Sequence, residues 1–205
     1  MTALFSDSPW PGLAAWTLLY VSDYCLTIYC ARLYAAKVRA EERLEGSYEL
    51  TPMFQRDVDA GRRISPRFLL MLFLSTAWLS MMWLLSRERP RKPEIYEFVL
   101  GMLLLLELLV HVRHIKNVVF FRTGFGPDGV RGYIEYPRPL ILRNSATELI
   151  AFAGLFLAAF AVTGSLFLLG GAMAAAATGL GHLRRSRKMA ATRQPVTEPA
   201  ERPEG

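Results

Sequence analysis

The chain alternates between long apolar runs and shorter polar segments. Apolar runs of about 18 residues or more, the length needed to cross a hydrocarbon core of roughly 30 Å, begin near Gly12, Phe68, Ile95 and Ala146. Backbone polar groups find no water in lipid, so each run must be helical there. The pattern therefore predicts an all-α integral membrane helical bundle.

The last apolar run, residues 146–183, is too long for a single pass. As one helix it would extend for about 57 Å at about 1.5 Å per residue, nearly twice the thickness of the bilayer core. Thr163-Gly164-Ser165 supplies the only polar, turn-capable break in this run. We therefore expect five transmembrane helices, at residues 12–33, 67–86, 95–117, 146–163 and 165–183.

The basic residues support this count and predict an orientation, because Lys and Arg are retained on the cytoplasmic side of a membrane. With five helices, twenty of the 24 basic residues lie on one side, in residues 32–67, 113–143 and 184–202, and four lie on the other. Four helices would weaken the division to fourteen against ten. We expect an outside N-terminus and a cytoplasmic C-terminus.

Residues 1–183 are thus expected to form a single transmembrane domain with cytoplasmic loops at residues 34–66 and 118–145. The segment before the first helix has no Lys or Arg and no cleavage pattern, which favours a retained helix over a signal peptide. The tail, residues 184–205, begins with basic residues. Its Pro- and Glu-rich end predicts disorder.

The two loops contain signals for short elements. Strong helix formers up to Gly46 predict that the first helix continues beyond the membrane. Thr51 followed by Pro52 predicts the start of a short amphipathic helix, which either lies on the inner membrane surface or forms a solvated linker. Pro137 and Pro139 predict extended chain with turns in the second loop, with at most a marginal hairpin.

Polar residues inside the first and third runs are the main candidates for chemistry. Asp23 and Glu107 both lie near the middle of their helices, so parallel passes would place them at similar depth. Glu107, His111 and His114 follow i, i+4, i+7 spacing and share one stripe, and Asp23 shares a face with Thr27. An ionised carboxylate at mid-bilayer costs about 2.5–3.5 kcal/mol, so a proton, an imidazolium or a bound cation must compensate. We expect the first and third helices to touch here.

Three interpretations of this cluster are open. It is a hydrogen-bond network that fixes helix register, or a proton or metal-cation site, or the two histidines are solvated at the helix end. A carboxylate with two histidines suits Zn²⁺ or Fe²⁺. The order Glu-x-x-x-His-x-x-His is nevertheless not the His-Glu-x-x-His order of metalloproteases.

Small residues at four-residue spacing predict close helix packing in the last two passes. They are Gly154 with Ala158, Gly170 with Ala174, and Gly171 with Ala175 and Gly179. The packing partner is the neighbouring helix of the hairpin or another protomer.

Glu148 is interpreted as part of a capping box that begins at Ser145. Cys25 and Cys30 lie on different faces and are interpreted as packing residues.

The first helix and the segment "YELTP" that follows it resemble an uncharacterised bacterial family of multi-pass membrane proteins. In that family an Asp-x-x-x-Thr helix precedes a Glu-x-Asn-Pro turn. Asp23, Thr27, Glu49 and Pro52 match this pattern, whereas Thr51 stands in place of the Asn, after a longer insertion. The resemblance covers a small part of the chain and implies no activity.

Enzymatic function is disfavoured because the sequence has no Walker-type glycine loop, no G-x-S-x-G and no recognisable catalytic triad. The net charge of +6 resides in residues that flank helices, which indicates attraction to anionic lipids instead of nucleic acid.

The leading expectation is a non-catalytic structural or accessory component of a bacterial inner membrane, without a cofactor. Its loops would bind a second copy or another membrane protein. The alternatives are a proton- or cation-translocating protein using Asp23, Glu107 and His111, and a membrane-embedded metalloenzyme.

Overall fold

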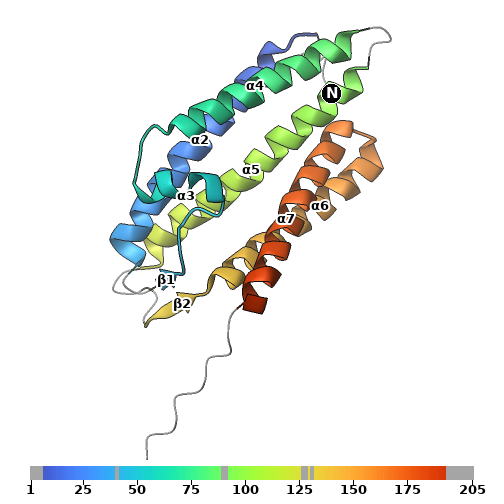
Figure 1. Cartoon of the computed structure of the whole chain (residues 1–205). Helices are drawn as coiled ribbons and strands as arrows, with labels where there is room; N and C mark the ends of the chain where they lie inside the picture. The colour runs from blue at the N-terminus through green and yellow to red at the C-terminus, as the bar shows by residue number, and fades with distance from the viewer. Residues whose placement is uncertain (1–6, 40–41, 89–91, 126–128, 130–131, 193–205) are drawn as a thin grey trace, which may run out of the picture.

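The computed structural model is an all-α bundle whose long helices run alternately up and down (Figure 1). It describes residues 7–39, 42–88, 92–125, 129 and 132–192. Five helices are long and apolar enough to cross a membrane: α2 (Trp10–Leu33), α4 (Pro66–Arg87), α5 (Pro93–Thr123), α6 (Arg138–Thr163) and α7 (Leu166–Thr192). The predicted five-helix membrane bundle is confirmed, and the chain is a multi-pass membrane protein.

The helix starts follow local sequence signals. Proline occupies the first turn of α4, where its missing N–H is harmless, and the Ser65 Oγ accepts a hydrogen bond from the Phe68 N–H at 3.3 Å. At the other end of the bundle, Gly164 adopts φ +65° and separates α6 from α7. The predicted break in the last apolar run is therefore correct.

Helix α6 begins at Arg138, eight residues earlier than residue 146. Pro137 stands at the N-cap and Pro139 in the first turn, where prolines are compatible with a helix, so the prediction of extended chain through Pro139 is wrong. Ser145 and Glu148 consequently lie inside α6, and the capping-box interpretation is also wrong. The Glu148 carboxylate instead forms ion pairs with Arg113 and Lys116 of α5.

The first loop contains little of the predicted helical extension. Helix α2 continues only through the π-helical turn η1 (Tyr34–Val38), and the chain then forms strand β1 (Glu42–Leu44). This strand pairs in parallel with β2 (Ile134–Tyr136) of the second loop. Among the described loop residues neither a long helix nor a hairpin forms, because the pairing of β1 with β2 overrides local propensity.

The short helix α3 (Pro52–Asp59) begins where Thr51 and Pro52 predict it. Its residue Val58 is buried in a cluster with Tyr24 and Ile28 of α2 and Phe68 of α4. At the C-terminus, α7 includes residues 184–192, so this basic part of the tail is helical. The predicted disordered end, residues 193–205, lies outside the described residues.

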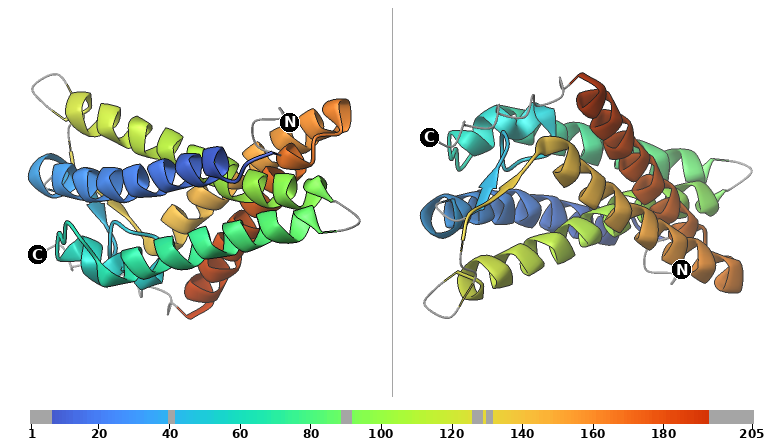
Figure 2. Two further views of the ribbon diagram at one scale, coloured as in Figure 1. Left: turned by 90° about the horizontal axis from the view of Figure 1, so that it is seen from above. Right: turned by 90° about the horizontal axis from the view of Figure 1, so that it is seen from below.

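Helix α5 lies between two helix pairs, α2 with α4 and α6 with α7 (Figures 1 and 2). We call the end of the bundle that carries α3, β1 and β2 the loop end. We call the opposite end, where α2 begins and α6 turns into α7, the hairpin end. The described residues of the two chain termini lie at opposite ends (Figure 1).

The hairpin end is tightly packed and apolar. Its core consists of buried side chains from α2, α4 and α5: Trp16, Leu79, Tyr96, Val99, Leu100 and Leu104. Helix α7 approaches α5 so closely that a Cβ on Gly101 would collide with the main chain of Phe167, and one on Gly170 with the main chain of Phe98. This end leaves no space for a polar ligand between α5 and α7.

The small residues of α7 pack as predicted within the chain. A Cβ on Gly171 would meet Leu105 of α5 and one on Gly179 would meet α6, and Ala174 and Ala175 are buried. The corresponding prediction for Gly154 and Ala158 is wrong within the chain. Both are exposed, and a Cβ on Gly154 would have no neighbour within 4 Å, because this stripe of α6 faces away from the bundle.

Candidate intramembrane cation site

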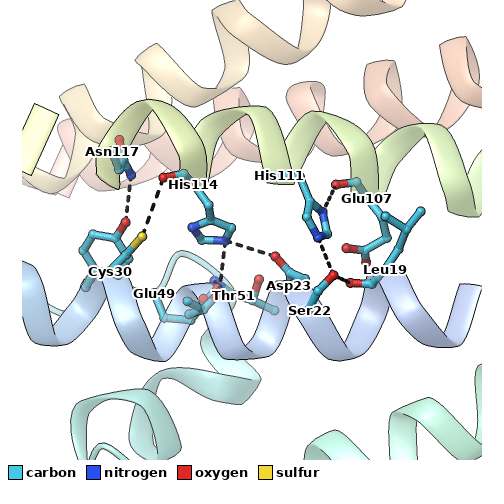
Figure 3. A network of polar contacts seen from close by, with 12 residues as sticks. Leu19, Ser22, Asp23, Cys30, Glu49, Thr51, Glu107, His111, His114 and Asn117 are labelled. Atoms are coloured by element: carbon cyan, nitrogen blue, oxygen red, sulfur yellow. Dashed lines mark hydrogen bonds and ion pairs between the residues drawn. The ribbon is translucent and has the colours of Figure 1, made fainter. Parts of the chain in front are cut away.

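Helices α2 and α5 meet at the polar residues singled out in the sequence. Asp23 of α2 and Glu107 and His111 of α5 each offer one ligand atom, and these atoms lie within 4.8 Å of one another. His114 and Thr27 lie one to two turns closer to the loop end. Figure 3 shows the side chains of both helices facing each other. The structure therefore brings all five predicted site residues to one helix contact.

His111 is held at both ring nitrogens. Its Nδ1 lies 2.7 Å from the main-chain oxygen of Glu107, and its Nε2 lies 2.7 Å from the Oγ of Ser22 (Figure 3). The Ser22 hydroxyl also lies 3.0 Å from the Leu19 oxygen. A hydroxyl has one hydrogen, so it donates to Leu19, leaving His111 as a double donor, or it donates to a neutral His111. The network is compatible with both protonation states of His111.

His114 connects the two helices a turn nearer the loop end. Its Nε2 lies 3.0 Å from Asp23 Oδ1 and 3.0 Å from Thr27 Oγ1. A carboxylate only accepts, so the Nε2–H donates to Asp23. The Nδ1 has no partner among the described residues, and His114 is 6% exposed. His114 is therefore buried in the helix contact and is not solvated at the helix end.

Glu107 is the least satisfied member of the cluster. Its Oε2 is buried and has no hydrogen-bond partner within the part of the chain that the structure describes. Buried carboxylate oxygens are normally paired, because an unpaired charge in a low-dielectric interior is costly. With the Asp23 carboxylate nearby, this oxygen calls for a bound proton, a cation or another hydrogen-bond donor.

A cavity of about 730 Å³ extends from this cluster to the loop end. Asp23, Glu107 and His114 line its deep part, and Tyr48, Glu49 and other loop residues line its other part. Helices α2, α3, α4, α5, α6 and α7 all contribute to the wall. The Asp23 side chain lines the cavity and retains 24% of its surface, so its carboxylate is accessible from the cavity.

The charges in the cavity wall are unevenly distributed. Arg113 and Lys116 form ion pairs with Glu148, which places the basic groups against the α6 wall. Asp23 and Glu107, at the deep end, have no Lys or Arg ion-pair partner among the described residues. The deep end of the cavity is therefore the part that attracts positive charge.

The structure also places a histidine and a serine in the cavity wall that the sequence analysis did not find. His182 of α7 lies with its Nδ1 2.9 Å from the Ser145 Oγ of α6, and both side chains are buried. His182 follows Gly179 by three residues, so it shares the stripe of α7 that packs against α6. That spacing was a usable signal for an inward-facing histidine. Ser22 left no such signal, because its role depends on the position of His111.

Of the two cysteines, Cys30 is buried and its Sγ lies 3.7 Å from the His114 main-chain oxygen, whereas Cys25 is exposed. The packing interpretation therefore fits Cys30 and not Cys25 within the chain.

The comparisons with known proteins give no relative: no family model, no curated protein and no solved structure matches the chain. The geometry of the cluster and its cavity is therefore the basis for the proposed function.

Proposed function

We propose that this membrane protein binds a cation at Asp23, Glu107 and His111 and carries it across the bilayer. One observation supports this most directly: two carboxylates and an imidazole nitrogen converge within 4.8 Å inside the bundle. The buried Glu107 Oε2, unpartnered among the described residues, adds to it. A network that served only to fix helix register would gain by pairing such an oxygen with a donor.

The donor set is chemically suited to cations. Ligands of one ion with bonds of about 2.0–2.5 Å lie at most about 4–5 Å apart, and the three ligand atoms fall within this limit. The bond from His111 Nδ1 to the Glu107 carbonyl orients the imidazole, as in many histidine sites, and Nε2 would exchange its bond to Ser22 for the cation. A proton bound between the carboxylates would satisfy the same charge requirement.

The surroundings of the cluster suit a carrier. The cavity gives access from the loop end, and the apolar core around Trp16 and Leu100 forms a barrier on the hairpin side. A carrier needs such a barrier, which opens when one part of the bundle moves against another. The excess of Lys and Arg at the loop end favours a cytoplasmic position for this end in a bacterial inner membrane.

The experiment uses the purified protein in proteoliposomes with imposed gradients of four probes: protons, Na⁺, Zn²⁺ and 3-phenylpropyltrimethylammonium. We expect flux of at least one probe, and at least about tenfold less flux of that probe in Glu107→Gln and in Asp23→Asn, since each variant removes a ligand charge. Glu94→Gln is the matched control, because it makes the same change at an exposed position of the same helix.

Thermal unfolding of each variant tests whether the bundle remains intact. The proposal is overturned if the parent protein moves none of the four probes. It is equally overturned if a folded Glu107→Gln variant retains the parent flux. In either case the cluster would not be the site of a cation carrier.

A further inference from the structure

We infer that the cation is an organic ammonium ion with an apolar, aromatic body. This inference rests on the proposed cation-binding function and specifies its ligand. It draws on three features of the cavity that the cation cluster alone does not explain: its volume, the composition of its wall and the hydrogen-bonding character of its deep end.

The volume is far larger than an inorganic ion requires. Cavities of about 300–1,000 Å³ hold drug-sized ligands, and this cavity measures about 730 Å³. Its wall includes α5 residues from Leu106 to Phe121, a distance of about 22 Å along the helix. A metal ion or proton would occupy only the deep end and leave this length unused.

The wall beside Asp23 is aromatic. Phe68 of α4 stacks between two tyrosines of α2, with ring centroids 5.2 Å from Tyr20 and 4.4 Å from Tyr24. All three rings line the cavity, and half of all the lining residues are aromatic or aliphatic. A hydrated inorganic ion gains nothing from such a wall, whereas an organic body gains by removing apolar surface from water.

The deep end offers buried hydrogen-bonding atoms that lack a partner. Glu107 Oε2 and His114 Nδ1 are buried and unpartnered among the described residues. With its Nε2 proton directed to Asp23, a neutral His114 carries a lone pair at Nδ1 and accepts there. A primary ammonium brings one positive charge and three N–H donors, which fits a pair of carboxylates with additional acceptors nearby.

The basic groups of the cavity do not oppose this ligand. Arg113 and Lys116 are directed to Glu148 at the α6 wall and lie about 9 Å and 14 Å along α5 from Glu107. The ammonium group would therefore occupy the negative deep end. The apolar body would extend along α5 toward Phe120 and Phe121.

Calorimetric titration of the full chain in lipid nanodiscs tests the inference, with empty nanodiscs subtracted. The probes are 3-phenylpropylammonium, its neutral counterpart 3-phenylpropan-1-ol, and methylammonium, which lacks the body. We expect 3-phenylpropylammonium to bind at least about tenfold more tightly than either of the others, as for the gain of one charge-assisted hydrogen bond or of a buried ring. Glu107→Gln should lose this preference for the amine over the alcohol, and Glu94→Gln should keep it.

Equal binding of the amine and the alcohol would overturn the inference, and so would equal binding of methylammonium and 3-phenylpropylammonium. These outcomes differ from failure of the proposed function. If protons, Na⁺ or Zn²⁺ cross the membrane in a Glu107-dependent manner while the arylalkylamine does not bind, the cation function stands and the organic ligand is excluded. Amine binding without Glu107-dependent transport of 3-phenylpropylammonium itself into proteoliposomes would leave a receptor for the amine and exclude a carrier.

Discussion

The two ends of this bundle are built by different means. The hairpin end is closed by apolar side chains and by glycines that allow α7 to approach α5, as at Gly101 and Gly170. The loop end contains the cavity, and ion pairs of Glu148 with Arg113 and Lys116 connect its α6 and α5 walls. In lipid, close packing is the main source of helix association, so the hairpin end anchors the bundle. The loop end is then free to hold a cavity with polar groups.

The largest loss of stability is expected when a larger side chain is placed in the closely packed hairpin end. Gly101→Leu places a side chain where even a Cβ would collide with the main chain of Phe167, so the α5–α7 contact must separate. We expect a loss of about 3 kcal/mol or more in the free energy of unfolding, measured by thermal or denaturant unfolding in detergent. Gly154→Leu is the matched control, since this glycine has no neighbour within 4 Å and should tolerate the change. Similar losses in both variants would contradict the contrast between the two ends.

A smaller and more local loss of stability is expected when Arg138, which connects α6 to the first loop, is replaced. Its side chain is buried and donates to the main-chain oxygen of Ser47 and, at 2.7 Å, to that of Glu49. Arg138→Met keeps the apolar stem and removes these charge-assisted bonds, which should cost about 1.5–3 kcal/mol.

Hydrogen exchange measures where that loss falls. We expect faster exchange of the amides of residues 42–51 and unchanged exchange in residues 96–104 of the hairpin end, because the bonds lie entirely at the loop end. Arg143→Met, at an exposed position of the same helix, is the control. Uniformly faster exchange throughout the bundle would show that the two ends are not independently stabilised.

The smallest effect on stability is expected when a larger side chain is placed in the cavity of the loop end. Val110 lines the cavity between Glu107 and Arg113, so the ring of Val110→Phe enters existing space. The free energy of unfolding should stay within about 1 kcal/mol of the parent value, in contrast to Gly101→Leu. The affinity for 3-phenylpropylammonium should fall at least about tenfold, because the ring takes the place of the ligand body. A large loss of stability would mean that the cavity is not available space.

Local pattern alone was sufficient for the membrane-spanning architecture. Five helices, the break at Gly164 and the starts at Pro52 and Pro66 follow from run length, proline position and glycine conformation, which are properties of neighbouring residues. The convergence of Asp23 and Glu107 was also predictable, because charged groups avoid lipid and must turn toward another helix.

Contacts between distant segments decided the rest. The pairing of β1 with β2, the early start of α6 and the ion pairs of Glu148 depend on how the two loops and helices α5 and α6 meet, which no local window contains. The same is true of the contacts that the Ser22 and Ser145 hydroxyls make with histidines of other helices. The residue order determined which groups must leave the lipid. The packing of α2, α5 and α6 determined which partners they found and that a cavity remained between them.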